Sequence, residues 1–244
     1  WKSVAVNLSD LAAMGAKPHS ILLALSLPTV DHGWLAGFSQ GLFDCCDQFG
    51  VGLIGGDTTQ SSQLTITVTA LGWIEHGQAI TRSGAQVGDY ICVSGQVGDA
   101  AFGLQHPGHA LQQRLDYPTP RCNLGQQLKG LASSMIDVSD GLAQDLGHIL
   151  KASNVGAKLQ LDQLPIDESL KKLEKQQAWH YALAGGDDYE LCFTISPQNF
   201  EKLLRQQLDV PLTIIGKITQ QTGLSFVYMG ENHPLAVQGY QHFA

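Results

Sequence analysis

The chain has 244 residues, enough to bury a large core and to form one large domain or two smaller ones. Its 22 acidic and 14 basic residues give a formal net charge of -8, which argues against the basic surface of a non-specific nucleic-acid binder. No apolar run approaches the roughly 20 residues of a membrane span and no secretory signal is visible, so we expect a cytoplasmic protein without nucleic-acid or membrane partners.

The first part of the chain predicts a helix, a strand and a second helix. Apolar residues recur at helical spacing over residues 2–14, and this helix carries a carboxylate, Asp10. Residues 18–27 predict a strand, and Asp31 is a candidate cap for a helix that reaches Phe49. By itself Asp10 reads as an ordinary solvated carboxylate beside a small-residue surface.

A glycine–aspartate sequence follows this helix. The apolar run 51–54 predicts a short buried strand that ends in Gly55-Gly56-Asp57. Glycine lets backbone amides approach a ligand, and the next carboxylate can hold Mg²⁺ through oxygen. The stretch therefore indicates a metal–phosphate corner or, equally, a tight turn in which Asp57 caps its own backbone.

Residues 64–74 alternate between apolar side chains and threonines and predict the clearest strand of the chain. The glycine-rich segment 77–89 that follows contains Arg82, which suits phosphate oxygens or is a solvated loop residue. We place a domain boundary here, with residues 1–80 in an N-terminal domain and 81–244 in a C-terminal α/β domain.

A second acidic sequence lies near the middle of the chain. After a strand at 90–94, a proline-rich linker and a helix at 121–131, the residues Asp137, Ser139 and Asp140 precede a helix at 142–151. A strand that runs into a helix N-terminus is an anion-binding geometry, and two nearby carboxylates repel each other unless a cation lies between them. Alternatively, Ser139 or Asp140 is the helix N-cap.

The last part of the chain repeats this pattern, in which strands and helices are joined by glycine–aspartate sequences. We expect a strand at 158–161, a charged surface helix at 167–177 and a second Gly-Gly-Asp sequence, ending in Asp187, before a strand at 191–195. A helix at 198–208 and strands at 212–218 and 224–228 complete the pattern, which supports an α/β or α+β fold.

Several motifs occur together along the chain: V-N-L-S-D-L-A-A-M-G-A, L-I-G-G-D-T-T, T-R-S-G-A, I-D-V-S-D-G-L, G-G-D-D-Y-E-L-C-F and the closing G-Y-Q-H-F. In this combination and order the chain resembles the thiamine-monophosphate kinases. The resemblance implies a two-domain, aminoimidazole ribonucleotide synthetase-like fold of the α/β class with mixed sheets. It also implies a homodimer that uses ATP and several Mg²⁺ ions to phosphorylate thiamine monophosphate to thiamine diphosphate.

The same resemblance implies roles for particular residues. Magnesium would be held by Asp10, Asp57, Asp137 and Asp140, and the nucleotide would be contacted by Gly56, Asp57, Arg82 and Ser139. Asp57 and Asp140 would be catalytic, while Asp187 and Tyr240 would contact thiamine phosphate. Asp187 stands where the family pattern usually has the longer glutamate.

The sequence departs from the family pattern at its start. Family members begin with a segment that holds a Gly-Asp-Asp metal motif, whereas this chain begins at Trp1, within what we read as the first long helix. We therefore expect an incomplete N-terminal domain and impaired activity in the chain as given.

Three alternatives stay open from the sequence. Another ATP-using enzyme of the same superfamily, such as selenophosphate or aminoimidazole ribonucleotide synthetase, would give no product with thiamine monophosphate. A non-catalytic, dimerising nucleotide-binding fragment would bind Mg²⁺–ATP without forming product. Aspartates that only bind a structural cation would let Ca²⁺ stabilise the fold as well as Mg²⁺ does.

Overall fold

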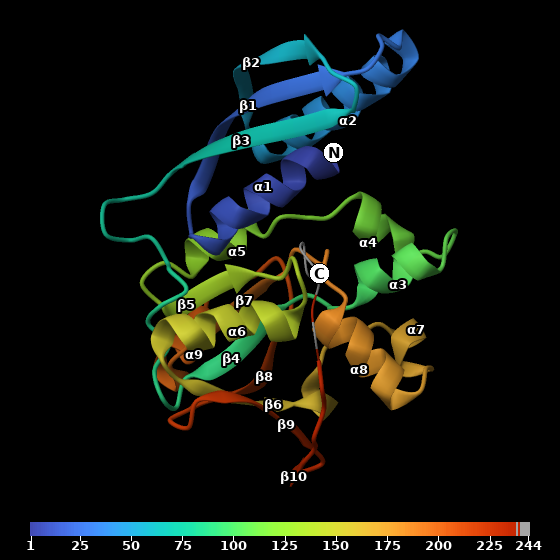
Figure 1. The fold of residues 1–244 in the computed structure, drawn as a ribbon. Helices are drawn as coiled ribbons and strands as arrows, with labels where there is room; N and C mark the ends of the chain where they lie inside the picture. The colour runs from blue at the N-terminus through green and yellow to red at the C-terminus, as the bar shows by residue number, and fades with distance from the viewer. Residues whose placement is uncertain (238, 240–244) are drawn as a thin grey trace.

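The computed structural model describes residues 1–237 and 239, and within them the strands form two sheets. In the smaller sheet, β1 (Lys17–Leu27) lies between β2 (Gly52–Gln60), to which it is parallel, and β3 (Thr65–Trp73), to which it is antiparallel. Helices α1 (Lys2–Ala13) and α2 (His32–Phe49) lie beneath this sheet in Figure 1. The helix–strand–helix order predicted for this part of the chain is confirmed.

Local sequence accounts for these elements. The carboxylate of Asp31 accepts hydrogen bonds from the amides of Gly33 (2.8 Å) and Trp34 (3.0 Å), which caps α2 as predicted. The alternation predicted in β3 is confirmed, because Ile66 and Val68 are half-buried while the threonines between them are exposed. The helix side of the sheet is therefore apolar.

The prediction of a short buried strand ending at a glycine–aspartate corner is wrong. Strand β2 is nine residues long and exposed throughout, and Gly55-Gly56-Asp57 lies in its middle, paired with residues 22–24 of β1. A Cβ atom on Gly56 would collide with the carbonyl oxygen of Leu23 in β1, so this glycine permits close pairing of two backbones. Glycine lowers strand propensity, but the hydrogen-bonding partner β1 overrides it.

The larger sheet follows the smaller one in sequence. Its strands are β4 (Tyr90–Ser94), β5 (Ala132–Asp137), β6 (Gly156–Gln160), β7 (Leu191–Ile195), β8 (Leu212–Thr219), β9 (Gly223–Tyr228) and β10 (Glu231–Asn232). In the described chain their order is β10-β9-β6-β8-β4-β7-β5, and the pairs are antiparallel except β6 with β9. A mixed α/β fold is thereby confirmed.

Helices cover both faces of this sheet (Figure 1). They are α3 (Asp99–Gln105), α4 (Gln112–Asp116), α5 (Cys122–Gln127), α6 (Leu142–Ser153), α7 (Glu168–Lys171), α8 (Lys175–Ala184) and α9 (Pro197–Leu203), with a short 3-10 turn at Leu161–Gln163. Leu146 of α6 and Leu183 of α8 pack with Val93 and Cys192 in one apolar core. No helix in the described part of the chain is long and apolar enough to cross a membrane.

The second core joins the two sheets. Leu8 of α1 and Ile21 of β1 belong to the same buried cluster as Leu124 of α5 and Phe193 of β7. Neighbouring residues of β7 alternate between the two cores, since Cys192 belongs to the first and Phe193 to the second. Helix α1 is therefore packed between the small sheet and the large one.

Three predicted helices have different bounds in the structure. The single charged helix expected over 167–177 is two helices, α7 and α8, and α8 buries Trp179 and Leu183. The helices expected to end at 131 and 208 end at Gln127 and Leu203. Charge and periodicity over a short window do not contain the tertiary contacts that end these helices.

Candidate active site

A cavity of about 300 Å³ opens where the two sheets meet. Its walls come from the end of α1, from the connection between β3 and β4, and from β5. The polar side chains that line it include Asp10, Arg82 and Asp137. The fold thus brings together two of the four predicted metal ligands and the arginine predicted to meet the nucleotide.

The two carboxylates at this cavity differ in exposure: the side chain of Asp137 is buried, whereas that of Asp10 is exposed. The pKa of Asp137 is raised to about 6, chiefly by burial and also by the Asp10 carboxylate, against the opposing effects of the nearby Ser9 hydroxyl and Arg82 guanidinium. Desolvation also raises the pKa of Asp10, again against the effect of Arg82. A cation between these carboxylates would relieve both the desolvation and the repulsion.

The segment that carries Arg82 is held against the large sheet. The Ser153 hydroxyl at the end of α6 accepts hydrogen bonds from the amides of Gly84 and Ala85, both at 3.1 Å, and donates to the Arg82 carbonyl at 3.3 Å. The amide of Met135 in β5 donates to the carbonyl of Thr81. The arginine therefore projects from an anchored segment.

The loop after Asp137 differs from the prediction that Ser139 or Asp140 caps the next helix. Gly141 is the N-cap of α6 and gives no side-chain cap, so neither Ser139 nor Asp140 is the N-cap. The amides of Ser139, Asp140 and Gly141 donate to one carboxylate oxygen of Asp145, at 3.0, 3.1 and 3.2 Å. The three amides that immediately precede this helix are thus occupied by the protein's own carboxylate.

A second loop, residues 185–190, forms backbone hydrogen bonds with the segment that follows Asp137. The amides of Asp187 and Tyr189 donate to the carbonyls of Ser139 and Val138, and the Val138 amide donates to the Glu190 carbonyl, all at 2.8 Å. Asp187 (φ 61°) and Tyr189 (φ 52°) are left-handed, an unusual backbone conformation for an aromatic residue. Strain of this kind is retained where the surroundings enforce it and gathers at functional sites.

Asp187 also joins the two parts of the chain. One of its carboxylate oxygens accepts a hydrogen bond from the Tyr189 hydroxyl at 2.8 Å, and the other lies 3.0 Å from the ammonium of Lys2, at the start of α1. The ion pair is partly exposed, so it contributes little to stability but places a positive charge beside a predicted substrate contact.

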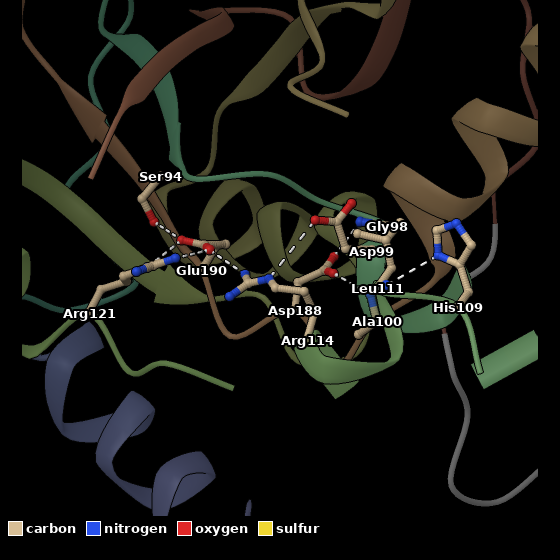
Figure 2. A network of polar contacts seen from close by, with 10 residues as sticks. All are labelled: Ser94, Gly98, Asp99, Ala100, His109, Leu111, Arg114, Arg121, Asp188 and Glu190. Carbon is tan, nitrogen blue, oxygen red and sulfur yellow. Dashed lines mark hydrogen bonds and ion pairs between the residues drawn. The ribbon is translucent and has the colours of Figure 1, made fainter. Parts of the chain in front are cut away.

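A buried ionic network includes the last residues of this loop, Asp188 and Glu190 (Figure 2). Glu190 is fully buried and accepts hydrogen bonds from the Ser94 hydroxyl (2.6 Å), Arg114 (2.6 Å) and Nε of Arg121 (2.7 Å). A second nitrogen of Arg121 pairs with the other carboxylate oxygen. Because Ser94 also accepts the Leu191 amide, the network fixes where the loop enters β7.

The network continues to a pair of buried aspartates. Asp188 accepts the amides of Gly98 (2.7 Å) and Ala100 (3.4 Å) at the start of α3, and burial raises its pKa well above the usual value. Burial likewise raises the pKa of Asp99 to about 6, although the Arg114 guanidinium, 3.9 Å away, acts in the opposite direction. Both side chains are 2% exposed.

We expect Asp99→Asn to make stability less dependent on pH. Since the folded-state pKa of Asp99 lies above its unfolded value near 3.9, its contribution to stability is fully present below about pH 4 and is lost as the pH rises through 6. The variant should therefore gain up to about 3 kcal/mol over the wild type between pH 4 and 7. Urea unfolding across this range measures it, with the exposed Asp116→Asn as control; a pH-independent difference would contradict the expectation.

The remaining predicted site residues lie elsewhere or outside the described chain. Asp57 pairs with Ala24 of β1, in a row with Thr67 of β3, on the sheet face away from α1, and its carboxylate accepts the amide of Thr58. Gly56 precedes it in β2, and Tyr240 lies outside the described residues. Within residues 1–237 and 239, no three acidic, histidine or cysteine side chains gather closely enough to hold a metal ion.

Sequence reasoning did not identify Lys2, Asp145 or the Glu190 network. A carboxylate in the first turn of a helix that begins with Gly-Leu was a signal for Asp145, because glycine has no side chain with which to cap. Arg114 and Arg121 are 76 and 69 residues away from Glu190 in sequence, so only the fold shows that they meet.

The chain is similar to known proteins along its whole length. The thiamine-monophosphate kinase of Haemophilus influenzae is 47% identical over 260 residues, which cover 100% of this chain and 79% of that protein. The crystal structure of thiamine-monophosphate kinase from Stenotrophomonas maltophilia K279a has a TM-score of 0.87 and 46% identity over 96% of this chain and 78% of that one. AaThiL complexed with AMPPCP and TMP has a TM-score of 0.87 and 30% identity, over 100% of this chain and 79% of that one.

Family models agree with this similarity. The model of the AIR synthase related protein N-terminal domain matches residues 1–74, and that of the C-terminal domain matches residues 86–229. The fold with these two sheets is thus that of an AIR synthase related protein. Within that class, the chain belongs to the thiamine-monophosphate kinase family, so the resemblance seen in the motifs is confirmed.

Proposed function

We infer that the protein is a kinase that transfers the γ-phosphoryl group of ATP to thiamine monophosphate and forms thiamine diphosphate. The observation that carries this inference is the 47% identity to a thiamine-monophosphate kinase over the full length of the chain. The similar structure with AMPPCP and TMP supports it, because AMPPCP is an analogue of ATP and TMP is the phosphate acceptor.

The reaction requires positioning more than proton transfer. An oxygen of the thiamine phosphate attacks the γ-phosphorus of ATP, the bond from that phosphorus to the β,γ-bridging oxygen breaks, and ADP leaves. The attacking oxygen is already anionic near neutral pH, so no strong general base is needed. The main obstacle is the approach of two polyanions, which cations and an in-line geometry overcome.

We propose that magnesium supplies this positive charge, and the cavity residues fit such an ion. Mg²⁺ is commonly held by one or two carboxylates together with substrate phosphates and water, so Asp10 and Asp137 are sufficient protein ligands at this cavity. Asp140 follows on the same anchored loop, with Ser139 and Arg82 as candidates for nucleotide contact. Asp57 and Gly56 stay predictions, and loss of Mg²⁺–ATP affinity in Asp57→Asn tests them separately.

The thiamine phosphate is proposed to bind on the side of Asp187. This aspartate and Lys2 lie at the junction of α1 with the 185–190 loop, next to the segment that follows Asp137. Tyr240 stays a predicted contact of the same substrate.

Thiamine diphosphate formation tests the proposed function directly. The protein is incubated with thiamine monophosphate, ATP and Mg²⁺, and the products are separated by chromatography. Stoichiometric formation of ADP and thiamine diphosphate is expected. ATP consumption without thiamine diphosphate would overturn the assignment in favour of another reaction of the same fold.

We propose that the protein acts as a homodimer through the outer face of the small sheet, the face away from α1. Leu22 at its centre is 37% exposed, and Leu71 and Trp73 of β3 are also large exposed apolar side chains. A second copy of this face is a suitable cover, since a face-to-face pair would bury both sets at once.

In Leu22→Glu, two carboxylates would meet across such an interface. Several kcal/mol of desolvation and repulsion should raise the dimer dissociation constant about 100-fold or more. Sedimentation velocity measures this, and Leu104→Glu on the exposed side of α3 is the control. A dimer of unchanged affinity in Leu22→Glu would place the interface elsewhere.

We also propose a cytoplasmic location. All five cysteines are free and buried, which suits a reducing compartment. Fractionation of cells that express the protein tests this proposal.

A further inference from the structure

Asp145 forms an unusual set of contacts, although it was not among the predicted site residues. It is 2% exposed, and one of its oxygens accepts three consecutive backbone amides, those of Ser139, Asp140 and Gly141. Its own amide donates to the Gly141 carbonyl at 2.9 Å, so the side chain and the backbone close the same turn.

These bonds decide what the turn can offer to a ligand. Three adjacent amides at a helix N-terminus ordinarily form a cradle for an anion. Here Asp145 accepts the three amides that precede α6, so these amides are not available to a phosphate. Contacts of the turn with a ligand then fall to its side chains, of which Asp140 also accepts a hydrogen bond from Nε2 of Gln144 at 3.2 Å. The opposite side of the segment is already bound, through the carbonyls of Val138 and Ser139, to the 185–190 loop.

We propose that Asp145 is a positioning residue that holds the Ser139–Asp140 turn in the conformation that receives Mg²⁺–ATP. The proposal rests on the proposed function, because it assigns the turn to the nucleotide side of that site. Asp145 itself touches neither metal nor nucleotide; it acts through the three amides. The turn is thereby set before the nucleotide arrives, which lowers the entropic cost of binding.

Binding of Mg²⁺–AMPPCP, measured by calorimetric titration, tests the proposal without turnover. Asp145→Ala should weaken binding by about 10-fold or more, the usual effect of removing a group that orients a metal ligand. Asp145→Asn keeps one oxygen acceptor in the same place and should recover most of this loss. The matched control is Asp167→Ala, which removes a carboxylate that accepts the Ser169 amide at the start of α7, away from the turn.

A second readout needs no ligand. In nitrogen-15 NMR spectra of the metal-free protein, the amide resonances of residues 139–141 should shift and lose exchange protection in Asp145→Ala but stay in place in Asp167→Ala. A purely structural role predicts that both alanine variants lower the melting temperature while Mg²⁺–AMPPCP affinity stays within about twofold of the wild type. That result, or unchanged amides in Asp145→Ala, overturns the proposal.

The experiment separates this proposal from the proposed function. A wild-type protein that binds Mg²⁺–AMPPCP but makes no thiamine diphosphate contradicts the kinase assignment, while the titrations still decide the role of Asp145. A wild-type protein that does not bind Mg²⁺–AMPPCP overturns both.

Discussion

Glu190→Ala is expected to lower the free energy of unfolding by about 3–5 kcal/mol, the usual cost of removing one partner from a buried ion pair. The wild-type carboxylate is fully buried and forms ion pairs with both Arg114 and Arg121. Without it, two guanidinium groups face each other in a site from which water is largely excluded. Arginine keeps its charge in such surroundings, so the cost is not relieved by deprotonation.

Urea unfolding monitored by circular dichroism measures this loss. Glu190→Gln should cost less, because the amide oxygen still accepts a hydrogen bond from an arginine. Glu168→Ala is the control, since it breaks an exposed ion pair with Lys171 and should change stability by less than about 1 kcal/mol. A loss of that small size in Glu190→Ala as well would show that water reaches the network and screens its charges.

Asp137→Asn is expected to abolish most of the kinase activity. The carboxylate that we propose as a ligand of the activating cation is replaced by a neutral amide, and the several kcal/mol that a metal ion contributes to a transition state correspond to a loss of about 10²- to 10⁴-fold in kcat/KM. The fold should tolerate the change well, because Asn has the same size and removes a poorly solvated negative charge. Low activity in a protein of undiminished stability is therefore the signature of a functional carboxylate.

The assay is thiamine diphosphate formation at saturating Mg²⁺, together with a melting curve for each variant. Asp162→Asn, an exposed aspartate in the 3-10 turn, is the matched control and should keep wild-type activity. Activity of Asp137→Asn within about tenfold of the control would remove Asp137 from the metal site.

Most helices and strands of this protein were predictable from sequence, because the pattern of apolar residues within each element determines its type. The helices α1 and α2 and the strands β3, β4 and β7 have patterns of apolar residues that leave one choice of structure. The prediction for strand β2 was wrong because its glycines were taken as a turn signal, whereas Gly56 allows the backbone of β1 to approach closely. The motif was found, but its conformation depended on a pairing partner about 30 residues away.

The site was predictable in part for a similar reason. Asp10, Arg82 and Asp137 lie in short motifs, and the fold places all three at one cavity. The groups that fix the neighbouring segments differ in this respect: Asp145 had a weak local signal, its place in the first turn of a helix that begins with Gly-Leu, and Glu190 had none. Their structural roles depend on partners that only the fold brings close: three backbone amides for Asp145, and two arginines that are distant in sequence for Glu190.

The apolar cluster that joins the two sheets has a thermodynamic consequence. Family models divide the chain between residues 74 and 86, yet Leu8 and Ile21 before this division share one core with Leu124 and Phe193 after it. Separation of the halves would expose both sides of that core to water. The chain therefore matches two family domains but should unfold as one cooperative unit. We expect heat to melt both sheets in a single calorimetric transition.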